Sequence, residues 1–106
     1  NIRGLKIMPY RIEESLTKAL PVAEVCLAAV PDRDGENHLC VALVAQADFD
    51  EADAIKCISG FLPRQFGLFH LVQVVNLPRT STGKIQRAAL RKGLIRHLAE
   101  QGVTGF

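Results

Sequence analysis

Residues 22–47 read VAEVCLAAVPDRDGENHLCVALVAQA, in which two nearly continuous apolar runs, residues 22–30 and 39–47, flank a stretch dense in turn-forming residues. Short apolar runs on either side of such a stretch predict an adjacent antiparallel pair of strands. Because neither run alternates polar with apolar residues, both faces of the pair should be buried. Helices are therefore expected above and below the strands.

The segments around this pair have the spacing of those helices. Pro9 opens a first helix that Pro21 ends, Asp50 is the candidate N-cap of a second helix that Pro63 ends, and residues 87–100 form a third. The apolar positions expected to face the core are Ile12, Leu16 and Leu20 in the first helix, Ile55, Ile58, Phe61 and Leu62 in the second, and Leu90, Leu94 and Leu98 in the third.

Two further segments complete the expected fold. Residues 69–75 are typical of a third main strand, and residues 1–8 of a small hairpin with a turn at its centre. Glu13 and Glu14 should favour the positively charged end of the first helix. The sequence thus predicts an α+β fold over residues 1–106 as a single domain, with a small mixed sheet of about three main strands flanked by helices, plus an N-terminal two-stranded hairpin.

Composition narrows the class of protein. A chain of 106 residues that is 48% hydrophobic is long enough for one compact domain, and its net charge of +2 implies no global field for nucleic acid or membrane. The longest apolar run, residues 39–45, is far shorter than the roughly 20 residues of a membrane span. Three cysteines, Cys26, Cys40 and Cys57, lie in apolar runs without metal spacing, which favours buried, reduced thiols in a cytoplasmic protein.

The candidate catalytic and ligand-binding residues are concentrated in residues 78–87, PRTSTGKIQR. This segment leads from the third strand into the last helix. Gly83 directly precedes Lys84, so this surface loop can adopt backbone angles that other residues resist and can approach a ligand closely. Thr80, Ser81 and Thr82 add short hydrogen-bonding groups. A lysine is a mobile point charge suited to an anionic oxygen, so Lys84 is predicted to be a catalytic cation.

Two other interpretations of this basic loop fit less well. A phosphate-binding P-loop needs glycine where Pro78 stands and serine or threonine where Ile85 stands. A nucleic-acid contact is disfavoured because the segment has no aromatic side chain for base stacking, and the chain's only tyrosine is Tyr10. A third alternative, a free-standing α+β interaction or regulatory module without catalysis, would keep the same fold and stays open.

The loop resembles the closing core motif of the adenylate-forming enzymes, which include acyl- and aryl-CoA synthetases, nonribosomal peptide synthetase adenylation domains and firefly luciferase. Residues 78–87 match that family's Pro-Arg-Thr-x-x-Gly-Lys-x-x-Arg pattern at every fixed position. Residues 3–13 resemble its Gly-x-x-Ile-x-Pro-x-Glu-Ile-Glu element, with Arg11 in place of the first glutamate. Short motifs between the two follow the family's order, so the resemblance covers essentially the whole chain, departing from it near residues 66–68.

The resemblance implies the C-terminal lid domain of a larger acid–thiol ligase. Such enzymes use ATP and Mg²⁺ to convert a carboxylic acid to an acyl-adenylate, then pass the acyl group to the thiol of CoA or of a carrier-protein pantetheine. A large N-terminal domain of the same polypeptide holds the nucleotide and the acid, and the small domain rotates between the two half-reactions.

By the same resemblance, each site residue has an expected role. Lys84 supplies the catalytic charge for adenylation, and the nucleotide loop comprises Thr80, Ser81, Thr82, Gly83 and Arg87. Arg87 would either pair with phosphates or anchor the last helix. The hairpin at Arg3, Gly4 and Leu5 would line the thiol channel. No metal ligand, nucleic-acid partner or membrane span is expected on this chain, and alone it should be inactive.

Overall fold

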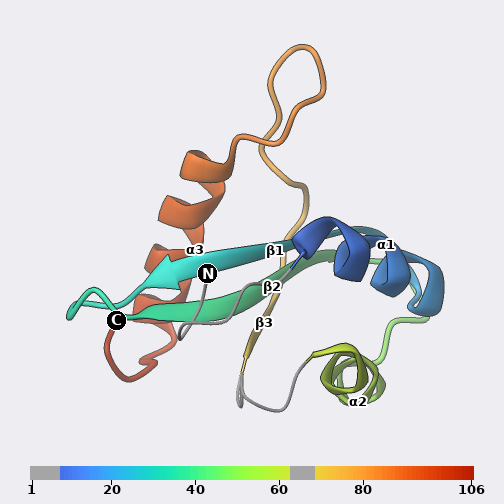
Figure 1. The fold of residues 1–106 in the computed structure, drawn as a ribbon, viewed down its shortest axis with the longest axis horizontal. Coiled ribbons are helices and arrows are strands. Elements are labelled where there is room, and N and C mark those ends of the chain that lie inside the picture. Colours follow the sequence, from blue (N-terminus) through green and yellow to red (C-terminus); the bar gives the residue numbers. More distant parts are fainter. Residues whose placement is uncertain (1–7, 63–68) are drawn as a thin grey trace.

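A computed structural model describes residues 8–62 and 69–106. Its elements, in chain order, are α1 (Pro9–Ala19), β1 (Val22–Pro31), β2 (Asn37–Ala45), α2 (Glu51–Phe61), β3 (His70–Gln73) and α3 (Arg87–Glu100). In the ribbon, α1 and α2 gather at one end of the strands, whereas α3 lies beside their other end (Figure 1). Within the described residues, no helix is long and apolar enough to cross a membrane.

The sheet is mixed, as the sequence predicts. Its strand order is β1-β2-β3, with β1 antiparallel to β2 and β2 parallel to β3. The predicted third strand is too long, because β3 comprises only His70–Gln73 and Val75 is 92% exposed. Residues 1–7, and with them most of the predicted hairpin, lie outside the described part of the chain.

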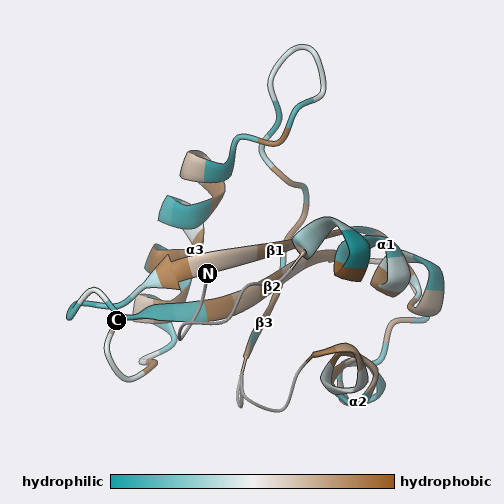
Figure 2. Cartoon of the chain, in the orientation of Figure 1, coloured by the Kyte–Doolittle hydropathy of each residue, from teal (hydrophilic) through white to brown (hydrophobic). Residues whose placement is uncertain are grey.

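The central strand β2 is buried on both faces. Side chains alternate between the faces of a strand, so Leu39, Val41 and Leu43 enter one core while Cys40 and Ala42 enter the other. Beyond its first residues, β2 is accordingly coloured mostly brown, as hydrophobic, in Figure 2. The first core contains Leu16, Val22, Val25, Leu27, Leu39, Val41, Leu43 and Ile58, and the second contains Cys26, Val30, Cys40, Ala42, Val72, Leu77, Leu90, Leu94, Leu98 and Phe106. Helices α1 and α2 therefore cover one face of the sheet, and α3 covers the other.

A β-bulge interrupts β1 close to its start. Val22 pairs with Ala45 and Glu24 with Val44, so Ala23 is the extra residue, and it is exposed. Because of the bulge, Val22 faces the first core together with Val25 and Leu27. Glu24 alternates with Val25 in the regular ladder that follows, so it lies on the opposite face, the face that α3 covers.

The helix patterns are confirmed in α1 and α3 and partly wrong in α2. Leu16, Leu90, Leu94 and Leu98 are buried, and Asp50 caps α2 by accepting a hydrogen bond from the Ala52 amide at 3.3 Å. Ile55 and Phe61, expected in the core, are 42% and 43% exposed. Ile58 is fully buried, as predicted. The contact face of α2 runs through Ile58 and the fully buried Ala54, whose small side chain lets the helix approach closely.

The acids of α1 also lie differently from the prediction. Neither Glu13 nor Glu14 lies in the first turn of the helix, so the expected helix-dipole role is wrong. Glu14 pairs with Lys18 at 3.5 Å on the exposed surface. Glu13 Oε2 instead accepts a hydrogen bond of 2.7 Å from the Leu27 amide on β1, which joins the helix to the outer edge of the sheet.

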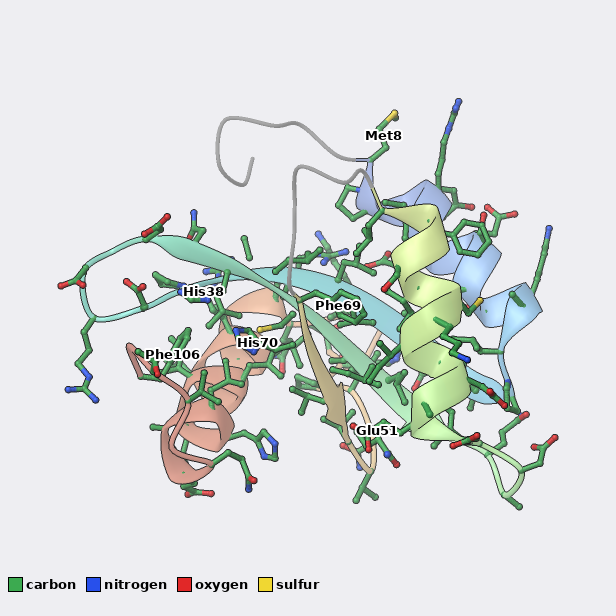
Figure 3. All side chains as sticks on the ribbon, turned by 90° about the horizontal axis from the view of Figure 1, so that it is seen from below. Met8, His38, Glu51, Phe69, His70 and Phe106 are labelled. Atoms are coloured by element: carbon green, nitrogen blue, oxygen red, sulfur yellow. The ribbon has the colours of Figure 1, made fainter. Side chains whose placement is uncertain are left out.

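A polar cluster holds the C-terminal end against the β1–β2 turn (Figure 3). Asp32 Oδ2 lies 3.0 Å from His38 Nε2, and His38 Nδ1 lies 3.2 Å from His70 Nε2. The Phe106 ring packs edge-on against both imidazoles, and the Arg33 amide donates to the Gly105 carbonyl at 2.8 Å. In the tautomer in which His38 Nε2 donates to Asp32, the neutral His38 ring accepts at Nδ1. The donor to Nδ1 is then the N–H at His70 Nε2.

The cluster predicts that the free energy of unfolding decreases on mild acidification. Desolvation and the neighbouring His38 lower the pKa of His70 from its ordinary value of 6.5. The unfolded chain therefore takes up this proton first, and stability is lost as the pH falls below about 6.5. Denaturant unfolding between about pH 7.5 and 5.5 measures the effect, well above the range in which the carboxylate of Asp32 titrates.

His70→Phe is the matched variant, because it keeps an aromatic ring against Phe106 and removes the titrating group. Its unfolding free energy should vary less over the same pH interval. An equally steep dependence in both proteins would show that His70 is not its source.

Candidate functional site

The lysine loop, residues 78–86, is a tight β-hairpin that projects from the body of the molecule (Figure 1). The Thr80 amide donates to the Lys84 carbonyl at 2.8 Å, and the Gly83 amide donates to the Thr80 carbonyl at 2.9 Å. Below this turn, Arg79 pairs with Ile85 in an antiparallel bridge, and the Gln86 amide donates to the Pro78 carbonyl at 2.8 Å. The loop is therefore a hydrogen-bonded structure with its own backbone ladder.

Gly83 is required by the geometry of this turn. Its φ of 89° lies in the left-handed region, as expected for the last residue of a three-residue hairpin loop. A Cβ built on Gly83 meets nothing within 4 Å. Backbone conformation, rather than lack of space, thus explains the glycine before the lysine.

Hydroxyl groups brace the turn from inside. Thr80 Oγ1 lies 3.0 Å from Thr82 Oγ1 and accepts a hydrogen bond of 3.2 Å from the Lys84 amide. Ser81 lies at the exposed tip. The structure therefore brings Thr80, Ser81, Thr82, Gly83 and Lys84 together in one hairpin, as the sequence indicates, with two of the three hydroxyls occupied in holding its shape.

Lys84 follows the turn and is exposed. No ion pair formed by residues 8–62 and 69–106 includes its ammonium group. Its backbone is fixed through both the amide and the carbonyl, whereas its side chain extends from a projecting element. The arrangement presents one cation away from the body of this chain.

Arg87 begins α3 and contacts the edge of the sheet. Its Nη1 lies 3.4 Å from the Leu27 carbonyl oxygen and 3.4 Å from Cys26 Sγ. Leu27 thus contacts both flanking helices through its backbone, because its amide donates to Glu13. Arg87 also lines a hollow of about 420 Å³ together with Tyr10 and Arg91. Of its two expected roles, these contacts correspond to anchoring the helix.

Glu24 is a residue that the sequence analysis does not single out. Its Oε1 accepts a hydrogen bond from Arg79 Nη2, and Arg79 Nη1 donates to the Gly83 carbonyl at 2.6 Å. One guanidinium therefore joins both arms of the lysine loop to β1. A signal was present in the sequence, since Glu24 is the only charged residue in the run from 22 to 30.

The buried thiols of β1 and β2 are poor nucleophiles. Burial, reinforced by the Glu13 carboxylate, raises the pKa of Cys26, and burial raises that of Cys40 to about 12. Cys26 and Cys40 are buried as expected, whereas Cys57 is only partly buried. Among the described residues, no three His, Cys, Asp or Glu side chains form a group that could hold a metal ion.

Comparison with known proteins identifies the family. No family model matches the chain. Gramicidin S synthase 2 of Brevibacillus brevis is 33% identical over 91 residues, which cover 86% of the chain and 2% of that synthase. The solved structure of ATP-bound MatB from Rhodopseudomonas palustris matches with a TM-score of 0.75 and 26% identity, over 87% of the chain and 19% of MatB. The chain belongs to the adenylate-forming superfamily.

A further adenylate-forming relative is the medium-chain fatty-acid–CoA ligase of Escherichia coli (strain K12), 26% identical over 101 residues. The match covers 92% of the chain and 18% of that ligase. The chain thus spans less than a fifth of each of these relatives. Arg3, Gly4 and Leu5, predicted to line a thiol channel in the adenylate-forming family, lie outside the described residues, as does the departure at residues 66–68.

The conformational role of Gly83 in the lysine loop is testable. Gly83→Ala should reduce the free energy of unfolding by about 1 kcal/mol, because an L-residue resists a positive φ even in open space. The matched control is Gly93→Ala in α3, which also meets nothing within 4 Å but lacks a positive φ. It should raise stability by up to about 1 kcal/mol, as measured by denaturant unfolding. Equal effects of the two substitutions would contradict the conformational explanation.

Proposed function

We propose that this chain is the C-terminal lid domain of a larger ligase. The enzyme would activate a carboxylic acid with ATP to an acyl-adenylate and transfer the acyl group to a thiol, that of CoA or of a carrier-protein pantetheine. The observation that carries the proposal is Lys84, an exposed cation on a braced hairpin that points away from its own domain. Such a group acts on something that the described part of this chain does not hold.

The chemistry assigned to Lys84 is electrostatic. When a carboxylate attacks the α-phosphate of ATP, two negatively charged groups must approach each other, and charge shifts onto the phosphate oxygens. A lysine that contacts both groups in a site closed to water lowers that barrier and holds the reactants in line. The braced backbone of residues 80–84 supports this role because the Cα that carries the lysine side chain is already positioned.

A partner domain is part of the proposal. The described residues offer no metal-binding group of three acids, histidines or cysteines, so ATP and Mg²⁺ would be held mainly by an N-terminal domain of the same polypeptide. A cavity of about 620 Å³ lies between α2, β3 and α3, but it is lined by residues such as Glu51, His70 and His97 and by none of the lysine loop. The lengths of the relatives support a larger parent protein.

The second half-reaction would use a different face of the domain. After the adenylate forms, rotation of the lid withdraws Lys84 and admits the thiol. The proposal that Arg3, Gly4 and Leu5 line the thiol channel rests on the sequence resemblance alone.

Substitution of Lys84 should separate the two half-reactions. In the full-length enzyme, Lys84→Ala is expected to slow adenylate formation by about 10²- to 10³-fold, the loss typical of one preorganised electrostatic group. Thioester formation from supplied acyl-adenylate should be largely unchanged. Pyrophosphate exchange measures the first step, and single-turnover thiolation measures the second.

Lys92→Ala is the matched control, since Lys92 is an exposed lysine on the neighbouring helix α3. It should leave both half-reactions at the wild-type rate. Equal losses in both steps for Lys84→Ala would mean that the lysine serves only the structure of the domain.

The 106-residue chain alone should show no adenylation activity. It would present the catalytic cation but lack the groups that hold ATP, Mg²⁺ and the acid. Pyrophosphate exchange with a panel of carboxylic acids tests this expectation. Turnover by the isolated chain, abolished by Lys84→Ala, would place a complete active site on this domain and overturn the two-domain account.

A further inference from the structure

The direction in which the lysine loop points depends on few contacts. At its base, Leu77 is buried and Ile85 is partly buried against the second core. Beyond this base, the hydrogen bonds at Thr80, Thr82 and Gly83 all lie within the hairpin. They fix its shape but not its angle to the sheet. Among the side-chain hydrogen bonds of the described residues 79–84, only that from Arg79 to Glu24 reaches from the loop to a strand.

Arg79 is suited to transmit an orientation. Its planar guanidinium contacts the Gly83 carbonyl in the turn and the Glu24 carboxylate on β1 at the same time. Because the fork is rigid, the two acceptors are held at a set distance and angle from each other. Gly83 directly precedes Lys84 in the chain, so the hydrogen bond from Arg79 holds the backbone next to the lysine.

Glu24 belongs to the regular part of the β1–β2 ladder, which begins directly after the bulge. It pairs with Val44 and lies on the face that α3 covers, next to the departing loop. The ladder continues without further interruption from Glu24 to Pro31. The carboxylate therefore sits on a fixed strand, 55 residues away from Arg79 in sequence.

The exposure of the pair decides what it contributes. The Arg79 and Glu24 side chains are 40% and 32% exposed. Ion pairs that are this open to solvent add little to the stability of a fold. The pair can nevertheless restrict the angle of the projecting hairpin. Such a restriction would affect the reaction rate, because small displacements of a reactive group alter rates strongly.

We propose that Glu24 and Arg79 form a positioning pair that orients the lysine loop, and thereby Lys84, toward the reacting groups. The inference rests on the proposed function of Lys84 and names the residues that direct it. Glu24 touches no substrate in this account and acts through Arg79. Its removal should therefore impair adenylate formation without weakening substrate binding or the fold.

The test uses Glu24→Gln in the full-length enzyme. Adenylate formation should lose about tenfold in kcat with little change in KM, whereas thiolation of supplied acyl-adenylate and the melting temperature should be unchanged. Arg79→Gln should have a similar or larger effect, because it also loses the contact to Gly83. Glu14→Gln is the matched control, since it removes one carboxylate from the Glu14–Lys18 pair of α1 and should change nothing.

Double variants separate positioning from a general structural role. Glu24→Gln should not reduce the kcat of adenylate formation further when Arg79→Gln is already present. It should also cause no further reduction in the Lys84→Ala background. Additive losses in both backgrounds, a wild-type kcat for Glu24→Gln, or equal damage to both half-reactions would each overturn the inference.

The same series keeps the two proposals distinct. A wild-type rate of adenylation in Lys84→Ala would refute the proposed function itself. A large loss in Lys84→Ala together with a wild-type Glu24→Gln would refute only the positioning pair.

Discussion

The antiparallel ladder between β1 and β2 is the constraint on which the rest of this structure depends. Both strands are buried on two faces, so each side chain along them belongs to one of two cores, and every helix packs against one of those cores. A shift of the register by one residue would exchange the cores and leave α1, α2 and α3 facing the wrong side chains. The bulge at Ala23 shows this sensitivity, because one extra residue is enough to turn Val22 into the first core, together with Val25 and Leu27.

The outer edge of β1 connects the fold to the proposed chemistry. Glu13 from α1 and Arg87 from α3 contact the amide and the carbonyl of Leu27, two polar groups that an edge strand leaves without a neighbouring strand. Nearer the start of β1, the Glu24 carboxylate accepts a hydrogen bond from Arg79 of the lysine loop. A single strand edge thus receives polar contacts from two helices and from the loop. In the proposed ligase, the cation would consequently move together with the domain rather than independently of it.

The parts of this molecule that could be predicted from sequence are those governed by local periodicity and motif. The strands, the leucine face of α3 and the lysine loop follow from apolar spacing, turn formers and a Gly-Lys pair. The rest depends on contacts between distant residues. The apolar spacing wrongly predicts Ile55 and Phe61 in the core, because spacing alone does not fix the rotation of α2. It likewise predicts Val75 in a strand that ends at Gln73. The Asp32–His38–His70 cluster and the Glu24–Arg79 pair form only when the fold brings their segments together.

The central claim is that a braced, oriented hairpin delivers Lys84 to groups bound by another domain. The most direct measurement is a crystal structure of the full-length enzyme with a non-hydrolysable acyl-adenylate analogue. Lys84 Nζ should lie within about 3 Å of the bound acyl or phosphate oxygens, with the Arg79–Glu24 contact and the hairpin hydrogen bonds retained. A structure in which the analogue is fully enclosed while Lys84 remains in solvent, or in which the hairpin has unfolded to reach it, would contradict this account.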